Sequence, residues 1–150
     1  MVIRESVLAS HEPAHILLAE DNPADQRLIA ESLNFNGLEH VLHVVSDGEQ
    51  ALTAAQLAGS TCQAPCPDVL ILDLGLPRVD GLEVLRAFRA NEHCIHTPVI
   101  VFSSSVAPEH RQAAESYPRV QFVIKPMNLD EFMEFGRTVK NMLVRAQGKG

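Results

Sequence analysis

The sequence predicts a doubly wound α/β fold, in which helices cover both faces of a parallel β-sheet. Short apolar runs recur five times along the chain, as in strands that are buried on both faces. Stretches of helical length separate these runs, and residues typical of helix starts stand at the junctions. Strands that alternate with helices form parallel sheets with right-handed crossovers. The five runs are residues 16–19, 41–45, 69–72, 99–102 and 122–124.

The first two strand–helix units are marked by residues that begin and end helices. After the first strand, Asn22 precedes Pro23, which is the order of an N-cap and a first helical residue. Gly37 suits the left-handed position that ends such a helix. After the second strand, Ser46 and Glu49 have the spacing of a capping box. Residues 59–67 are rich in turn residues and are predicted to form the longest loop.

The remaining units show apolar residues at helical spacing. Asp80 precedes the third helix, a fourth helix lies between the last two strands, and Asn128 precedes the fifth. Five units of this kind fit a flavodoxin-like sheet with strand order 2-1-3-4-5 and five helices. The apolar stripes are Leu82, Leu85 and Phe88 in the third helix, and Leu129, Phe132, Val139 and Leu143 in the fifth.

Composition bounds the class of protein and excludes two kinds of partner. The chain has 150 residues, of which 46% are hydrophobic, enough for one domain with a buried core. The net charge of −7 argues against nucleic acid as a partner, because phosphate binding needs clustered Lys and Arg. No apolar run approaches the roughly 18 residues of a membrane span, so no membrane partner is predicted.

One domain, residues 15–146, is predicted between two short terminal segments. Residues 1–14 lack the apolar segment of a signal peptide and are expected to be a flexible leader, which favours a cytoplasmic protein. Residues 147–150 are expected to be a short tail with no output domain. Since no export signal is present, the cysteines at positions 62, 66 and 94 are not expected to form disulfides. Their spacing fits no zinc site.

Polar side chains stand at the predicted carboxyl ends of four strands. Glu20 and Asp21 follow the first strand and Asp73 ends the third, while Ser103 and Lys125 follow the fourth and fifth. Ligands of open α/β sheets bind beyond these strand ends, so the five side chains are expected to converge. Each alone has a simpler interpretation, such as a helix cap, a turn or a solvated charge. Their joint placement favours one site.

This set of residues has the chemistry of a phosphoryl acceptor. Crowded carboxylates either keep a proton or bind a cation, and carboxylate oxygens with a backbone carbonyl suit Mg²⁺. Lys125 and Ser103 can neutralise phosphoryl oxygens, while Asp73 supplies the attacking oxygen. An aspartyl phosphate is an established product of nucleophilic carboxylates.

The motifs resemble the response-regulator receiver family of two-component signalling. The resemblance covers about residues 16–143 and rests on ILLAEDNPADQRLI, DVLILDLGLPRVDGLEVLRAFR, PVIVFSSS and FVIKP, in this order, with VVSDGEQAL between the first two. Within the family, the AEDNPAD opening and the long connector before PDVLILDL are most similar to single-domain regulators that are partnered with bacterial phytochromes.

The resemblance assigns a role to each residue that matches a family motif. Asp73 would be the phosphoacceptor and Lys125 its cationic partner, and the peptide bond between Lys125 and Pro126 would be cis. The cofactor would be Mg²⁺, which Mn²⁺ can replace. Its ligands would be Asp21 directly, Glu20 through water, Asp73, and the backbone carbonyl of Gly75. Ser103 would be the switch hydroxyl and Phe122 the aromatic switch residue.

Three of these positions depart from the commoner family pattern. Ser103 replaces threonine and lacks its β-methyl group, which leaves the switch side chain less restricted. Phe122 has no hydroxyl, so its inward or outward position cannot depend on a phenolic hydrogen bond. Gly75 offers no side chain and, with Ser105, is expected to influence how water reaches the aspartyl phosphate.

The function implied by the resemblance is signalling without turnover of an external substrate. A sensor histidine kinase would phosphorylate Asp73, Ser103 and Lys125 would move inward, and Phe122 would follow. The surface of the fourth helix, fifth strand and fifth helix would change. The message would then pass by partner binding, homodimerisation through that surface, or a phosphorelay.

Three alternatives remain at this point. A haloacid-dehalogenase-type phosphatase also uses an aspartate nucleophile, but it needs a second Asp where this chain has Gly75. A flavodoxin-like cofactor binder is disfavoured because Glu20 and Asp21 would repel the phosphate of FMN. A receiver scaffold that is never phosphorylated is disfavoured by the intact set of polar residues.

Overall fold

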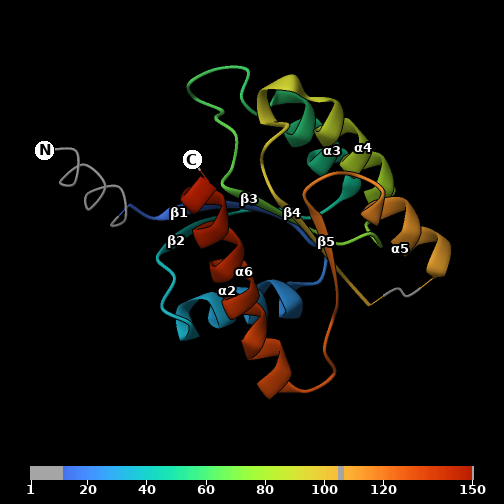
Figure 1. Cartoon of the computed structure of the whole chain (residues 1–150). Helices are drawn as coiled ribbons and strands as arrows, with labels where there is room; N and C mark the ends of the chain where they lie inside the picture. The colour runs from blue at the N-terminus through green and yellow to red at the C-terminus, as the bar shows by residue number, and fades with distance from the viewer. Residues whose placement is uncertain (1–11, 105–106, 150) are drawn as a thin grey trace, which may run out of the picture.

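A five-stranded parallel sheet with helices on both faces forms the core of the protein, as predicted (Figure 1). The computed structural model describes residues 12–104 and 107–149. The strand order is β2-β1-β3-β4-β5, and all four pairings are parallel. The strands are β1 (Ala14–Ala19), β2 (His40–Val45), β3 (Val69–Leu72), β4 (Val99–Ser103) and β5 (Val120–Ile124).

Five helices and one short 3₁₀ turn complete the fold in the described part of the chain. They are α2 (Pro23–Phe35), α3 (Gly48–Leu57), α4 (Gly81–Ala90), η1 (Glu92–Cys94), α5 (Pro108–Glu115) and α6 (Leu129–Lys149). Helix α6 continues to Lys149, into the segment that the sequence assigns to a tail. Most of the predicted leader lies outside the described residues. No described helix is both long enough and apolar enough to cross a membrane.

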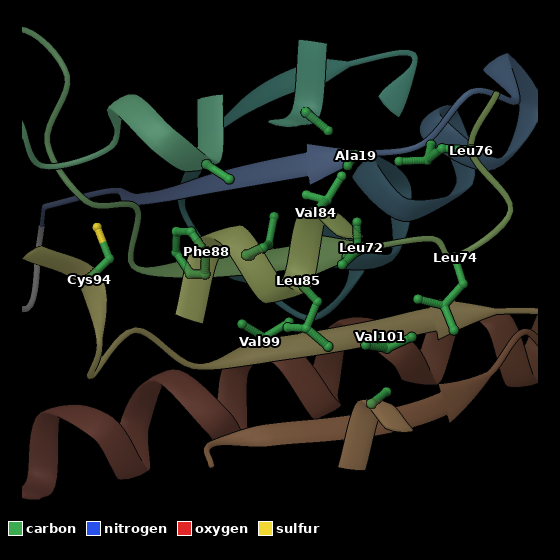
Figure 2. Close-up of a cluster of buried hydrophobic side chains, with 14 of the residues drawn as sticks. Ala19, Leu72, Leu74, Leu76, Val84, Leu85, Phe88, Cys94, Val99 and Val101 are labelled. Carbon is green, nitrogen blue, oxygen red and sulfur yellow. The ribbon is translucent and has the colours of Figure 1, made fainter. Parts of the chain in front are cut away.

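The sheet divides the core into two layers because successive side chains of a strand point to opposite faces. On one face, Val69 and Ile71 of β3 pack with α2 and α6. On the other, Leu70 and Leu72 pack with α3, α4 and α5. Figure 2 shows this second layer, in which Phe88 of α4 is fully buried over the sheet. Because helices cover both faces of the sheet, every residue of β3 is buried, and all four are apolar.

Helix ends follow the predicted chemistry with one correction. The Asn22 side chain accepts from the Ala24 and Asp25 amides at 2.8 and 3.2 Å, as an N-cap does. At the other end of α2, Gly37 has φ +71°, and the Leu38 amide donates to the Leu33 carbonyl in a Schellman motif.

The correction concerns α3, whose N-cap is Asp47 and not the predicted Ser46. Asp47 accepts from the Gln50 amide at 2.8 Å, while the Gln50 side chain accepts from the Ser46 amide at 3.1 Å. The cap is therefore shifted by one residue: Asp47 and Gln50 have capping-box spacing, and the Gln50 side chain reaches the amide of the residue before the cap.

Helices α2 and α6 approach each other closely at a glycine. A Cβ atom built on Gly136 would lie 2.0 Å from the Ser32 carbonyl oxygen, so only glycine fits. Beside it, the side-chain nitrogen Nδ2 of Asn36 donates to the Ser32 and Met133 carbonyls, both at 2.8 Å. These contacts hold the α2–α6 layer together through backbone atoms of both helices.

The expectation that the cysteines form no disulfide is wrong, because Cys66 and Cys94 are bonded to each other. Cys66 lies in the long loop before β3 and Cys94 in η1, 28 residues later. Their Cα atoms come within 5.6 Å because Gly59, with φ +78° and no side chain, lets the loop lie against η1. Cys62 is the free, exposed cysteine of the described residues.

Candidate functional site

The predicted polar residues meet at the carboxyl edge of the sheet. The order β1-β3-β4-β5 places their strand ends side by side, so residues far apart in sequence become neighbours. Glu20 and Ser103 are each 1% exposed and Asp73 is 8% exposed, whereas Asp21 faces solvent. The structure thus brings these side chains and Lys125 together at one edge of the sheet.

Asp73 is held at both carboxylate oxygens. Its Oδ1 accepts from the Ser103 hydroxyl at 2.9 Å and from the Gly75 amide at 3.0 Å, and its Oδ2 accepts from the Lys125 ammonium at 2.9 Å. Burial raises the pKa of Asp73, but the Gly75, Lys125 and Ser103 donors together lower it below the ordinary 3.8. At neutral pH the side chain is therefore an oriented carboxylate.

Lys125 reaches three carboxylates among the described residues. Its Nζ lies 2.8 Å from Glu20 Oε1, 2.8 Å from Asp25 Oδ2 and 2.9 Å from Asp73 Oδ2. Burial lowers the pKa of the ammonium, but the three carboxylates outweigh burial and raise it above its ordinary value. Lys125 therefore stays protonated at physiological pH.

Asp25 was not predicted as a site residue because it does not follow a strand. It is the third residue of α2, in the first helical turn. The start of the helix could have indicated it, because Asn22 and Pro23 place the first turn of α2 directly after the end of β1. An acidic residue one turn into a helix that starts at the rim can reach back over the site.

Glu20, Asp21 and Asp73 form a group that fits a divalent cation. Each offers a carboxylate oxygen, and these atoms lie within 4.8 Å of one another. Lys125 pairs with Glu20, Asp25 and Asp73, so with Asp21 the carboxylates at this edge outnumber the ammonium group that they surround. Oxygen donors of this kind, with room for water at exposed Asp21, suit Mg²⁺ or Mn²⁺.

Glu20 gives the site a pH dependence. Burial raises the pKa of Glu20 from 4.5 to about 7, despite its contacts with Lys125 and the Asn22 amide. The folded state thus binds more protons than the unfolded state between these values. The stability that protonated Glu20 contributes is fully present below pH 4.5 and is lost as the pH rises through about 7. The loss in the free energy of unfolding is at most about 3 kcal/mol.

This sign can be checked by urea unfolding without divalent cations between pH 5 and pH 8. Relative to Glu20→Gln, the wild-type protein should lose unfolding free energy as the pH rises. Glu31→Gln, which removes an exposed carboxylate from α2, is the matched control and should keep the wild-type slope. Equal slopes in wild type and Glu20→Gln would contradict the assignment.

The two predicted switch residues occupy buried positions. Ser103 donates to Asp73 as described, and Phe122 is 7% exposed within the layer of α3, α4 and α5. The Arg111 guanidinium of α5 lies 5.3 Å from the centroid of the Phe122 ring, a cation–π contact. Phe122 is thus held by packing and by Arg111, without a phenolic hydroxyl.

Three further expectations from the resemblance have different outcomes. The peptide bond between Lys125 and Pro126 is trans in this structure, not cis. Ser105 lies outside the described residues. The Gly75 amide contacts Asp73, and its predicted carbonyl ligand role remains a prediction.

Comparison with known proteins places this site in a family. Residues 16–135 match the family described as response regulator receiver domain. Response regulator Rcp1 of Synechocystis sp. is 38% identical over 96 residues, which are 64% of this chain and 65% of Rcp1. The match therefore spans slightly less than two thirds of that relative.

Three solved structures carry the same fold with related sequences. The phosphorylated cyanobacterial phytochrome response regulator RcpA is 29% identical, with a TM-score of 0.78 over 89% of this chain and 95% of that one. The Mn²⁺-bound form of Rcp1 is 31% identical, with a TM-score of 0.75 over 86% and 93% of the two chains. The receiver domain of sensor histidine kinase PA1611 from Pseudomonas aeruginosa PAO1, with magnesium in its active site cleft, is 26% identical, with a TM-score of 0.67 over 88% and 98%. The chain belongs to the response regulator receiver domain family.

Proposed function

We propose that this protein is a response regulator that accepts a phosphoryl group on Asp73 from a sensor histidine kinase, in a reaction that needs Mg²⁺. The observation that carries the proposal is the environment of Asp73. Its carboxylate is ionised, oriented by Ser103, Gly75 and Lys125, and placed within a carboxylate group that suits a divalent cation.

The reaction follows from this arrangement. An Asp73 oxygen attacks the phosphorus of the kinase phosphohistidine, an O–P bond forms, and the P–N bond breaks with its electron pair on the imidazole nitrogen. The lowered pKa keeps Asp73 ionised for this step. Lys125 and Ser103 donate to phosphoryl oxygens as charge redistributes. Glu20, Asp21 and Asp73 would hold the cation, which would supply positive charge to neutralise phosphoryl oxygens.

The relatives support the cofactor and the type of partner. The Mn²⁺-bound Rcp1 and the magnesium-bound PA1611 receiver favour the same cations here. RcpA and Rcp1 favour a phytochrome-linked kinase as the donor. No external substrate is turned over in this scheme, apart from slow loss of the phosphoryl group to water, and the proposed setting is the cytoplasm.

The output surface is proposed to be the face of α5, β5 and α6. Ile124, Met127 and Leu129 are exposed apolar residues on or beside β5 and the start of α6, which favours a homodimer or a protein partner there. Phosphorylated Asp73 would signal through this face, by dimerisation, by binding a target, or by passing the phosphoryl group on in a phosphorelay.

Intact mass spectrometry after incubation with acetyl phosphate tests the proposal. The wild-type protein should gain the mass of one phosphoryl group with Mg²⁺, and none after the cation is chelated. Mn²⁺ should restore the gain. A mass that stays unchanged with either cation would contradict phosphorylation and would favour a scaffold that acts through binding alone.

A further inference from the structure

Asp25 contacts the phosphorylation site from outside the strand ends that build it. Its Oδ2 lies 2.8 Å from Lys125 Nζ, across a sequence separation of 100 residues. The side chain is 23% exposed, so the contact is partly shielded from water. None of the roles assigned above to the cation, the acceptor or the switch requires a residue at this position.

The backbone of Asp25 is fixed independently of Lys125. Its amide donates to the Asn22 side chain at 3.2 Å, within the N-cap that begins α2. A carboxylate in the first turn of a helix is also stabilised by the helix dipole. The carboxylate therefore has a defined position from which to hold a cationic side chain.

The acceptors of Lys125 divide into two kinds. An ammonium group has three donors, and Lys125 directs them to Glu20, Asp25 and Asp73. Glu20 and Asp73 also belong to the group of carboxylates that suits a cation. Among the described residues that group does not include Asp25. If Glu20 and Asp73 turned oxygens to a cation, Asp25 would remain as an acceptor for Lys125.

We propose that Asp25 is a positioning residue for phosphoryl acceptance, which holds the Lys125 ammonium beside Asp73 while the other carboxylates bind Mg²⁺. This inference rests on the proposed function for its kinetic consequence. Without Asp25, Lys125 would be less well placed to meet the phosphoryl oxygens. Because the electrostatic contribution of a donor depends on its orientation before reaction, acceptance would slow.

A double-mutant cycle on labelling by acetyl phosphate at saturating Mg²⁺ tests the kinetic part. Asp25→Asn keeps the shape but removes the charge, and should slow labelling about tenfold. In a Lys125→Ala background the same substitution should change the rate less than about twofold, because its target is gone. Glu31→Gln, an exposed change on the same helix, should leave the rate unchanged. Equal slowing by Asp25→Asn in both backgrounds would overturn the proposal, as would no slowing in either.

Nitrogen-15 NMR of the Lys125 ammonium tests the placement without any phosphoryl donor. Lys125→Ala identifies the signal. With Mg²⁺, the wild-type signal should be protected from solvent exchange, whereas Asp25→Asn should lose that protection. Without Mg²⁺ both proteins should keep it, because Glu20 and Asp73 remain as acceptors. Protection that is unchanged in Asp25→Asn with Mg²⁺ would refute the proposal.

The two measurements separate this inference from the function on which it rests. If the wild-type protein takes no label while the ammonium shows the Mg²⁺-specific dependence on Asp25, the proposed function fails and the placement of Lys125 by Asp25 stands. Asp25→Glu, which keeps the charge on a longer side chain, should recover part of both the rate and the protection. Circular dichroism of each variant confirms that the fold is retained.

Discussion

Replacing Asp73 with asparagine is expected to abolish phosphoryl transfer and to leave the fold intact. The amide has no ionised oxygen to attack phosphorus, while its oxygen can still accept from Ser103 and Gly75 in nearly the same shape. The loss should be complete, because the other nearby carboxylates are directed to Lys125 or toward the cation. Intact mass spectrometry with acetyl phosphate and Mg²⁺ measures it.

Asp68, which directly precedes β3, provides a matched control. It precedes β3 as Asp73 follows it, so it lies at the opposite edge of the sheet, where it accepts from the His15 amide at 2.7 Å. Asp68→Asn should therefore take up one phosphoryl group like the wild-type protein. Full labelling of Asp73→Asn, or loss of labelling in Asp68→Asn with the fold retained, would show that the acceptor is elsewhere.

Replacing Gly136 with valine is expected to destabilise the packing of α6 against α2 strongly. The new Cβ would lie 2.0 Å from the Ser32 carbonyl oxygen, which is backbone and cannot rotate away. Helix α6 would have to move off α2, disturbing Asn36 and the apolar contacts of both helices. We expect a loss of about 4 kcal/mol in the free energy of unfolding.

Urea denaturation measures this loss, and Glu134→Val is the control. Glu134 is exposed two residues earlier on α6, so the same β-branched residue enters the same helix without meeting α2. Its cost should stay below about 1 kcal/mol, from helix propensity and a lost exposed ion pair. Similar costs for the two valines would show that the helices are not in close contact at Gly136.

The sequence predicts the architecture well because local patterns and global topology agree. The apolar run 69–72 predicts a strand buried on both faces, and it is β3 at the centre of the sheet. Asn22 and Gly37 mark the ends of α2 through chemistry that acts within one turn of the chain. Such features need no knowledge of tertiary contacts.

What the sequence could not predict depends on distances between remote segments. Cys66 and Cys94 carry no mark of their pairing, since it depends on how the loop lies against η1. Asp25 is likewise ordinary in sequence, and only the approach of α2 to the end of β5 brings it to Lys125. The shift of the α3 cap from Ser46 to Asp47 is a smaller case, in which two adjacent polar residues compete for one role.

The central position of β3 also bears on how the domain can move. All four residues of this strand are buried, and it is paired on both sides, with β1 and with β4. Backbone amides in such a strand exchange their hydrogens only when the whole domain opens, whereas edge elements open locally at lower free energy. Strand β5, which carries Phe122 and leads to Lys125, is at the edge and partly exposed. Asp73 thus follows a strand that is buried and paired on both sides, whereas Phe122 and Lys125 belong to the edge strand and its end, where local opening costs less free energy.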